Sequence, residues 1–211
     1  MKNKSKFKSR IIYTNRIDYI PKRKEYRDAI DSRLIDWIIT MGSTPIGVPN
    51  LLESKCLLSD WLNYIKPQGI ILSGGDNIGE FKFRDLTEYK LLKYATLKSI
   101  PVLGICRGMQ IMSSYYGSKL EAVSGHSGTS HKLITLNKNI NYPKKVNSFH
   151  DYRIKLCPSE FNITAISDDE TIEAIKHKKY PFEGWMWHPE RDKEFSDILL
   201  NLARNLFSIN Q

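Results

Sequence analysis

The sequence predicts an α/β fold: a three-layer α/β/α sandwich with a mixed, mostly parallel central sheet. In the first half, short apolar runs alternate with helical segments, which is typical of parallel βαβ units. In the second half, shorter β-rich segments are typical of antiparallel strands. The chain has 211 residues, of which 41% are hydrophobic and 11% aromatic. This is enough for one sizeable core, so we expect a single domain over residues 1–211, with a flexible basic tail at residues 1–6.

The first half predicts strands and helices in strict alternation. Residues 7–14 are expected to form the first strand. Residues 26–41 are expected to form an amphipathic helix, because apolar residues recur at helical spacing until Gly42 ends the pattern. The elements expected next are an extended segment at 44–49, a helix at 57–65, a strand at 69–72, a helix at 86–97, a strand at 102–105 and a helix at 109–116.

The second half predicts the rest of the sheet and a closing helix. Short antiparallel strands are expected at 131–136, 152–156, 163–167 and 172–176, a buried strand at 185–187, and a helix at 195–207. Ligands of open α/β sheets bind beyond the carboxyl ends of the strands. Gly74, Gly75, Cys106 and His188 all follow predicted strands, so we expect these distant segments to converge.

The segment Gly104-x-Cys106-x-Gly108 is the cysteine form of a nucleophile elbow. A strand that reverses directly into a helix strains the residue at the turn, and small neighbours prevent a clash. The side chain is then held at a helix N-terminus, where the helix dipole favours a thiolate. The alternative is a buried structural cysteine.

The segment His188-Pro189-Glu190 supplies the partners that a nucleophilic cysteine needs. A base takes the thiol proton, and an acceptor orients the base. Pro189 constrains the backbone so that Glu190 can turn back toward the imidazole. We therefore predict a catalytic triad of Cys106, His188 and Glu190. The alternative is a tryptophan-rich strand that ends in a surface histidine.

Cysteine attack on an amide creates an oxyanion that backbone N–H groups must stabilise. The N–H of Arg107, next to the nucleophile, is one expected donor. The second is expected from Gly75, because glycine lets the backbone approach closely. An ordinary tight turn is the alternative for Gly74-Gly75.

Four motifs in this order resemble the class I glutamine amidotransferases, and among them the free-standing γ-glutamyl hydrolases of the peptidase C26 group, which have a flavodoxin-like fold. The motifs are Ser73-Gly-Gly-Asp76, Gly104-Ile-Cys-Arg-Gly-Met-Gln110, Val146-Asn-Ser-Phe-His150 and His188-Pro-Glu190. The resemblance implies hydrolysis of a γ-glutamyl amide without a cofactor. It also implies a substrate site that comprises Gly74, Asp76, Asn77, Arg107, Gln110, His126, Ser148, Phe149 and His150.

The formal charge of +9, without a nucleic-acid-binding motif, favours an anionic small-molecule substrate over nucleic acid. Together with Arg107 and the short chain, it makes the sequence similar to small bacterial hydrolases of γ-glutamyl-CDP-amidate, which release cytidine diphosphoramidate for capsular phosphoramidate synthesis. The Arg107 guanidinium could equally pair with a structural carboxylate. The alternatives are a γ-glutamyl-aminobutyrate or polyamine hydrolase, a glutaminase subunit that supplies ammonia to a synthetase, a basic nucleic-acid-binding module and a non-enzymatic scaffold.

Three well-separated cysteines favour a reducing, cytoplasmic location. No metal site is expected, because His126 and His131 lack a third ligand at suitable spacing. No membrane association is expected, because no run approaches about 18 apolar residues. The sequence leaves homo-oligomerisation open.

Overall fold

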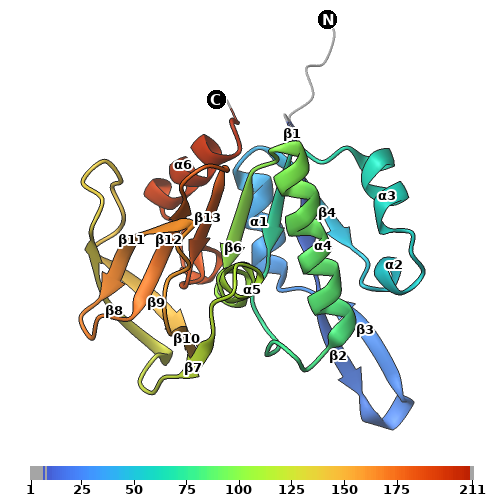
Figure 1. Ribbon diagram of the computed structural model, residues 1–211, viewed down its shortest axis with the longest axis horizontal. Coiled ribbons are helices and arrows are strands. Elements are labelled where there is room, and N and C mark those ends of the chain that lie inside the picture. The colour runs from blue at the N-terminus through green and yellow to red at the C-terminus, as the bar shows by residue number, and fades with distance from the viewer. Residues whose placement is uncertain (1–6, 8, 210–211) are drawn as a thin grey trace, which may run out of the picture.

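The computed structural model describes residue 7 and residues 9–209, and the predicted tail at 1–6 lies outside this range. Nine strands form one sheet in the order β4-β1-β5-β6-β13-β12-β11-β8-β9 (Figure 1). In that order their bounds are Ser43–Val48, Ser9–Thr14, Gly69–Leu72, Val102–Ile105, Phe182–Trp185, Ile172–His177, Phe161–Ser167, Ser127–Thr135 and Lys145–Phe149. The first five are mutually parallel, whereas β12, β11, β8 and β9 pair antiparallel with their neighbours. The prediction of a mixed sheet with a parallel core is confirmed.

Helices cover both faces of the sheet. Their bounds are Ser32–Thr40 for α1, Leu51–Ser54 for α2, Leu58–Ile65 for α3, Lys82–Lys98 for α4, Arg107–Tyr115 for α5 and Asp197–Leu206 for α6. Successive side chains of a strand point to opposite faces. Accordingly, Ile11 packs in the cluster that includes α1 and α6, and Ile12 packs with α3, α4 and α5. These two apolar layers confirm the three-layer α/β/α architecture (Figure 1).

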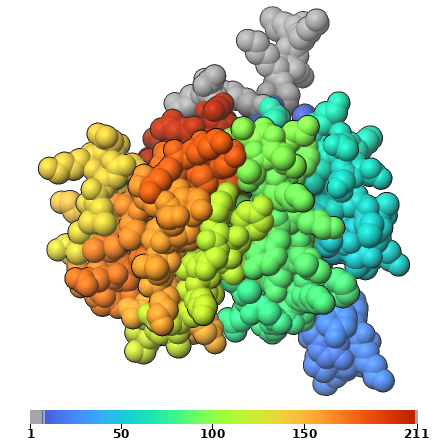
Figure 2. Space-filling model, in the orientation of Figure 1, coloured from blue at the N-terminus to red at the C-terminus, as the bar shows by residue number. Residues whose placement is uncertain are grey.

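Two small sheets accompany the large one. β2 (Arg16–Ile20) and β3 (Glu25–Ala29) form a hairpin around a short 3₁₀ turn at Pro21–Arg23. β7 (Leu120–Ala122) pairs antiparallel with β10 (Tyr152–Ile154). Figure 2 shows the β2–β3 hairpin standing out from the body of the molecule in blue.

The predicted helix at residues 26–41 is wrong in its N-terminal part. Glu25–Ala29 is a strand, and the helix begins at Ser32 because the Asp31 side chain accepts a hydrogen bond of 3.0 Å from the Arg33 N–H. The hairpin is largely exposed, so no buried stripe marked it in the sequence. The predicted strand at 185–187 is also misplaced, because β13 ends at Trp185.

The longest described helix is α4, which is polar over much of its length. Within residues 9–209, none of the helices combines the length and apolar character that crossing a membrane requires.

Candidate functional site

Cys106 stands at the junction of β6 and α5 in a strained backbone conformation, with φ 53° and ψ −109°. Its glycine neighbours permit this junction. A Cβ on Gly104 would lie 2.6 Å from the carbonyl carbon of Gly108, and a Cβ on Gly108 would lie 1.9 Å from the carbonyl oxygen of Leu72. Neither position tolerates a side chain, because backbone atoms cannot move aside. The thiol is thereby fixed at the N-terminus of α5 and is only 5% exposed.

His188 follows β13, and Pro189 begins a 3₁₀ turn that brings Glu190 back toward the imidazole. The distance between His188 Nδ1 and Glu190 Oε1 is 2.7 Å, and both side chains are buried. The Asn147 side chain holds the backbone of His188 from both sides. It accepts from the His188 N–H over 3.0 Å and donates to the His188 carbonyl over 2.8 Å.

The pKa of His188 reflects opposing influences. Burial lowers it, but the negative charge of Cys106 and hydrogen bonds with Cys106 and Glu190 outweigh burial and raise the pKa to about 9. The imidazolium is therefore the favoured form of His188 at neutral pH.

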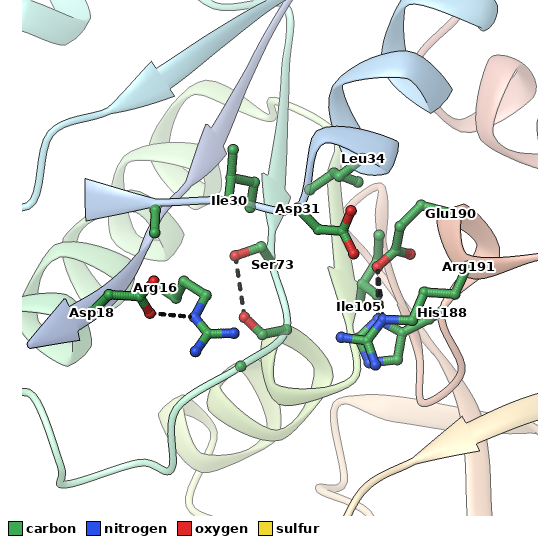
Figure 3. A pocket seen from close by; sticks show the side chains of 13 residues that line it. Arg16, Asp18, Ile30, Asp31, Leu34, Ser73, Ile105, His188, Glu190 and Arg191 are labelled. Carbon is green, nitrogen blue, oxygen red and sulfur yellow. Dashed lines mark hydrogen bonds and ion pairs between the residues drawn. The ribbon is translucent and has the colours of Figure 1, made fainter. Parts of the chain in front are cut away.

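Gly74 fits between these two side chains. A Cβ at this position would lie 2.6 Å from His188 Cε1 and 3.6 Å from Cys106 Cβ. The carboxyl ends of β5, β6 and β13 thus place Gly74, Cys106 and His188 around one point. Figure 3 shows the turn at Ser73 facing the His188–Glu190 pair.

One buried guanidinium holds the turn that follows β5. Arg84 is fully buried and donates to the carbonyl oxygens of Ser73, Gly74 and Gly75 over 2.8–2.9 Å. The Arg84 guanidinium also forms ion pairs with the carboxylates of Asp76 and Glu88. The carboxylate of Asp76 is therefore occupied inside the protein, and it also accepts from the Ile17 N–H over 2.9 Å.

Arg107 requires a correction. The resemblance implies that its side chain contributes to the substrate site, but the guanidinium is buried and bonded to the carboxylates of Asp85 and Glu88. This contact agrees with the alternative interpretation of the sequence, in which the Arg107 guanidinium pairs with a structural carboxylate. Charge complementarity with two acidic side chains of α4 draws the side chain inward. Its backbone N–H, at the first position of α5, has no acceptor within the helix.

Two cavities meet at this site. The first has a volume of about 190 Å³ and lies on the Cys106 side; it is lined by Gly75, Asp76, Asn77, Cys106, Arg107, Gln110, Phe149, His150, Asp151 and Tyr152. Arg107 borders this cavity although its guanidinium is buried against Asp85 and Glu88. The second has a volume of about 260 Å³ and lies on the His188 side (Figure 3). Its lining includes Arg16, Asp18, Ile30, Asp31, Gly74, His188, Glu190 and Arg191.

Several residues that the resemblance implied for substrate binding lie in the first cavity. The Gln110 amide donates to the Tyr152 carbonyl over 2.9 Å, which fixes its orientation. Asn77 is exposed at the rim. Phe149 packs edge-on against His188, with 5.8 Å between the ring centroids. This cavity therefore offers an amide, backbone groups and an aromatic wall next to Cys106.

Two others lie elsewhere. Ser148 and His126 are buried and line neither cavity; instead, the Ser148 hydroxyl donates to the His126 carbonyl over 2.5 Å. Ser148 pairs with Thr129 in the β8–β9 ladder, and His126 immediately precedes β8. The side chains of Ser148 and His126 therefore have partners within the protein, and a place for these two residues in the substrate site stays a prediction.

Sequence reasoning missed Arg84, Glu88 and Asn147. Arg84 and Glu88 have the i,i+4 spacing of a helical ion pair, which normally indicates a solvated surface, yet both side chains are fully buried. Asn147 lies within a quoted motif, but its partner His188 is distant in sequence. No local sequence pattern indicated that the Arg84–Glu88 pair is buried or that Asn147 contacts His188.

Comparisons with known proteins agree with this geometry. Residues 27–200 match the family model described as glutamine amidotransferase class-I. Over 148 residues, the chain is 33% identical to a γ-glutamyl-CDP-amidate hydrolase of Campylobacter jejuni, covering 67% of this chain and 70% of that protein. Over 169 residues, it is 29% identical to a subunit of the glutamine-hydrolysing GMP synthase of Pyrococcus furiosus, covering 75% and 86%.

The same fold occurs in solved structures. A crystal structure described as a GMP synthase subunit of Thermoplasma acidophilum superposes with a TM-score of 0.73 at 23% identity, covering 96% of this chain and 94% of that chain. A glutamine amidotransferase of Thermotoga maritima superposes with a TM-score of 0.64 at 14% identity, covering 96% and 86%.

Proposed function

Since this chain belongs to the class I glutamine amidotransferase family, we propose that it is a cysteine-dependent hydrolase of γ-glutamyl amides, with γ-glutamyl-CDP-amidate as its substrate. One observation carries the hydrolase proposal. A cysteine in a strained elbow interacts with a buried imidazole, and that imidazole is paired with a glutamate at 2.7 Å. Cys106, His188 and Glu190 then act as nucleophile, proton carrier and orienting carboxylate.

The reaction follows from these positions. The Cys106 thiolate adds to the γ-carbonyl carbon, and the backbone N–H groups of Gly75 and Arg107 receive the oxyanion. His188 gives its proton to the leaving nitrogen, and the C–N bond breaks to leave a γ-glutamyl thioester. His188 then takes a proton from water, which attacks the thioester and releases glutamate and the free thiol.

The two cavities fit the two halves of such a substrate. The cavity that contains Cys106, Gln110 and Phe149 suits the glutamyl group, whose α-amino and α-carboxylate groups need both donors and acceptors. The leaving group then extends past His188 into the second cavity.

Two arginines that line the second cavity, Arg16 and Arg191, support the proposal of a phosphate-bearing leaving group. They take the role that the sequence analysis gave to Arg107, whose guanidinium is buried. The Arg191 guanidinium lies 4.7 Å above the Phe149 ring, and its Nε forms a long ion pair of 3.9 Å with Glu190 Oε1 but makes no hydrogen bond among the described residues. Arg16 is about half exposed and pairs with Asp18 over 2.9 Å. Guanidinium groups suit phosphate oxygens because they can donate two parallel hydrogen bonds.

A substrate panel tests the proposal. The purified chain is assayed for glutamate release from γ-glutamyl amides with nucleotide, neutral and polyamine leaving groups. We expect cleavage of all of them at unequal rates, with the highest kcat/KM for the nucleotide amide and the greatest sensitivity to added salt for that substrate. Preference for the polyamine would overturn the substrate assignment, and no glutamate release from any amide would overturn the hydrolase.

The glutaminase subunit is a second candidate, favoured by the similarity to the GMP synthase subunit of Pyrococcus furiosus. Such a protein would hydrolyse glutamine and deliver ammonia to a synthetase partner. Activity of the isolated chain separates the two, because a partner-dependent subunit idles alone, whereas a free-standing hydrolase reaches full rate. All three cysteines are free, which suits the reducing cytoplasm that we propose as its location.

A further inference from the structure

Three histidines surround one buried glutamate behind the wall of the Cys106 cavity. Glu173 lies on β12, His131 lies on β8, His126 immediately precedes β8, and His150 immediately follows β9. No local pattern in the sequence groups them, because His150 and Glu173 come from segments distant from His126 and His131. We refer to these four residues as the histidine cluster.

The ligand atoms of the histidine cluster converge on one carboxylate oxygen. Glu173 Oε1 lies 3.6 Å from His126 Nδ1, 3.2 Å from His131 Nε2 and 3.6 Å from His150 Nε2. The ligand atoms of His126, His150 and Glu173 all lie within 4.8 Å of one another. Around a tetrahedral zinc ion with ligands at about 2.0–2.2 Å, neighbouring ligand atoms are about 3.3–3.6 Å apart. The three distances to Glu173 match that spacing, and His131 is linked to the group of His126, His150 and Glu173 through its contact with Glu173. The widest separation within that group, 4.8 Å, exceeds the spacing, so zinc would draw its side chains closer together.

The outer nitrogens of two imidazoles determine what their inner nitrogens can do. His126 Nε2 lies 3.0 Å from the Asp169 carboxylate, and His150 Nδ1 lies 3.0 Å from the Tyr152 carbonyl oxygen. Both partners are acceptors, so the outer nitrogens carry the protons. In the neutral imidazoles, His126 Nδ1 and His150 Nε2 therefore present lone pairs to the Glu173 carboxylate, which is itself an acceptor. Acceptors that face each other in this way need a cation between them, and a carboxylate or carbonyl behind a histidine is the usual support of a metal ligand.

The hydrogen-bond partners of the histidine cluster lead to the same conclusion. The Glu173 side chain is fully buried, and those of His126 and His150 are nearly so. Among the described residues, five atoms at the centre are buried without a hydrogen-bond partner: His126 Nδ1, His131 Nε2, His150 Nε2 and both carboxylate oxygens of Glu173. Three of these atoms are imidazole nitrogens that face Glu173 Oε1 at 3.2–3.6 Å without good hydrogen-bond geometry, and such a convergence points to a cation between them.

We propose that His126, His131, His150 and Glu173 bind one zinc ion. Imidazole nitrogens with one carboxylate are a typical donor set for zinc, and four protein ligands close a tetrahedral site, which indicates a structural ion. Three neutral imidazoles, one carboxylate and Zn²⁺ carry a net charge of +1, which the neighbouring Asp169 balances. The ion joins β8, β9 and β12 and fixes His150, which lines the cavity beside Cys106.

A metal-free arrangement leaves more groups unsatisfied. In it, a protonated His131 would pair with Glu173, and that contact does raise the pKa of His131. One such pair still leaves the lone pairs of His126 and His150 directed at a carboxylate. The experiment must therefore distinguish zinc binding from a metal-free ion pair of His131 with Glu173.

The experiment measures metal in the wild-type protein, purified without chelators, by inductively coupled plasma mass spectrometry. We expect about one zinc ion per chain. Strong chelation should lower the Tm, and added Zn²⁺ should restore it. Replacing zinc with Co²⁺ should give the intense visible absorption of a tetrahedral site. These measurements need no variant, so they decide the question even if a substituted chain fails to fold.

Variants locate the ion. His126→Ala, His150→Ala and Glu173→Gln should each reduce the zinc content and abolish the cobalt spectrum. His177→Gln is the matched control, because His177 is a largely buried histidine on the same strand as Glu173 and accepts from backbone N–H groups instead. It should retain zinc, as should His188→Ala, which removes the proposed base.

Three outcomes would overturn the proposal. They are wild-type protein with only a small fraction of one zinc equivalent and a Tm that added Zn²⁺ does not change, a different transition metal at full occupancy, and full zinc content in all three cluster variants. None of these results depends on which amide the enzyme cleaves, so the zinc site and the hydrolase can fail independently.

Discussion

Arg84 Nη2 donates a hydrogen bond of 2.9 Å to the carbonyl oxygen of Gly74. In a trans peptide the carbonyl and the following N–H point in opposite directions. Holding the Gly74 oxygen on the Arg84 side therefore aims the N–H of Gly75 to the other side of the same peptide plane. Arg84 is a positioning residue for the proposed oxyanion donor, although it lies within the protein and lines neither cavity.

Arg84→Lys should reduce kcat by up to about a hundredfold, because a single ammonium cannot hold three successive carbonyls and the Gly75 N–H loses its orientation. KM should change little. Kinetics and a thermal melt check this. Arg10→Lys is the matched control, because Arg10 also donates to two carbonyls, those of Ile65 and Lys66, away from the site. Equal kcat losses in the two variants would contradict the positioning role.

Cys106→Ala should reduce turnover by on the order of 10⁴-fold or more, because no other group can form the thioester. Cys56→Ser and Cys157→Ser should stay active, since Cys56 is exposed and burial raises the pKa of Cys157 to about 11, which disfavours its thiolate. Glutamate release and mass spectrometry of a trapped acyl-enzyme measure this. An acyl adduct on either of the other cysteines would refute the assignment.

The raised pKa of His188 predicts how stability depends on pH. A histidine whose folded-state pKa lies above its unfolded value of about 6.5 contributes stability in full below about pH 6.5 and loses it as the pH rises through about 9. Urea titrations at about pH 6 and pH 10 should therefore show a larger loss of unfolding free energy for the wild type than for His188→Gln. Parallel losses in the two proteins would argue against the ion pair.

Arg107 and Arg191 should differ when each is replaced by methionine. Arg107→Met removes one of the two arginine partners of buried Glu88 and the arginine partner of Asp85, and it should cost about 3–5 kcal/mol of stability, measured by denaturant titration. Arg191→Met should leave stability nearly unchanged and raise KM for the nucleotide amide by about tenfold or more, with little effect on a neutral amide. A KM effect confined to Arg107→Met would restore the sequence-based assignment of that residue.

The sequence predicted the fold well where burial and periodicity coincide. The strands Gly69–Leu72 and Val102–Ile105 are buried on both sides, so they read as continuous apolar runs, and the structure places both near the predicted bounds. The hairpin of Arg16–Ile20 and Glu25–Ala29 escaped prediction because most of its side chains are exposed and carry no alternation. Its pairing depends on a turn and cross-strand contacts such as Tyr19 with Tyr26, which local pattern does not reveal.

The candidate site shows the same contrast between features that a local motif predicts and features that depend on distant residues. The proposed triad of Cys106, His188 and Glu190 could be predicted from the sequence, because a nucleophile elbow and a His-Pro-Glu turn are local and leave a motif. The burial of Arg107 depends on Asp85 and Glu88 of another helix, and the histidine cluster depends on Glu173 from a strand far along the chain. Both features depend on the direction of side chains and on partners that are distant along the chain. The spacing of residues in a single sequence reveals neither of these.

The place of β13 has a consequence for the order in which the molecule forms. It is the last strand of the large sheet along the chain, yet it lies between β6 and β12, next to the middle of the sheet. Until Phe182–Trp185 emerges from the ribosome, the parallel and antiparallel parts have no strand to join them, and each exposes an apolar edge. Such non-local pairing is slow and prone to aggregation. A nascent chain that stops before residue 182 would lack both the joining strand and His188, the proposed proton carrier, so the sheet and the proposed site are completed by the same segment.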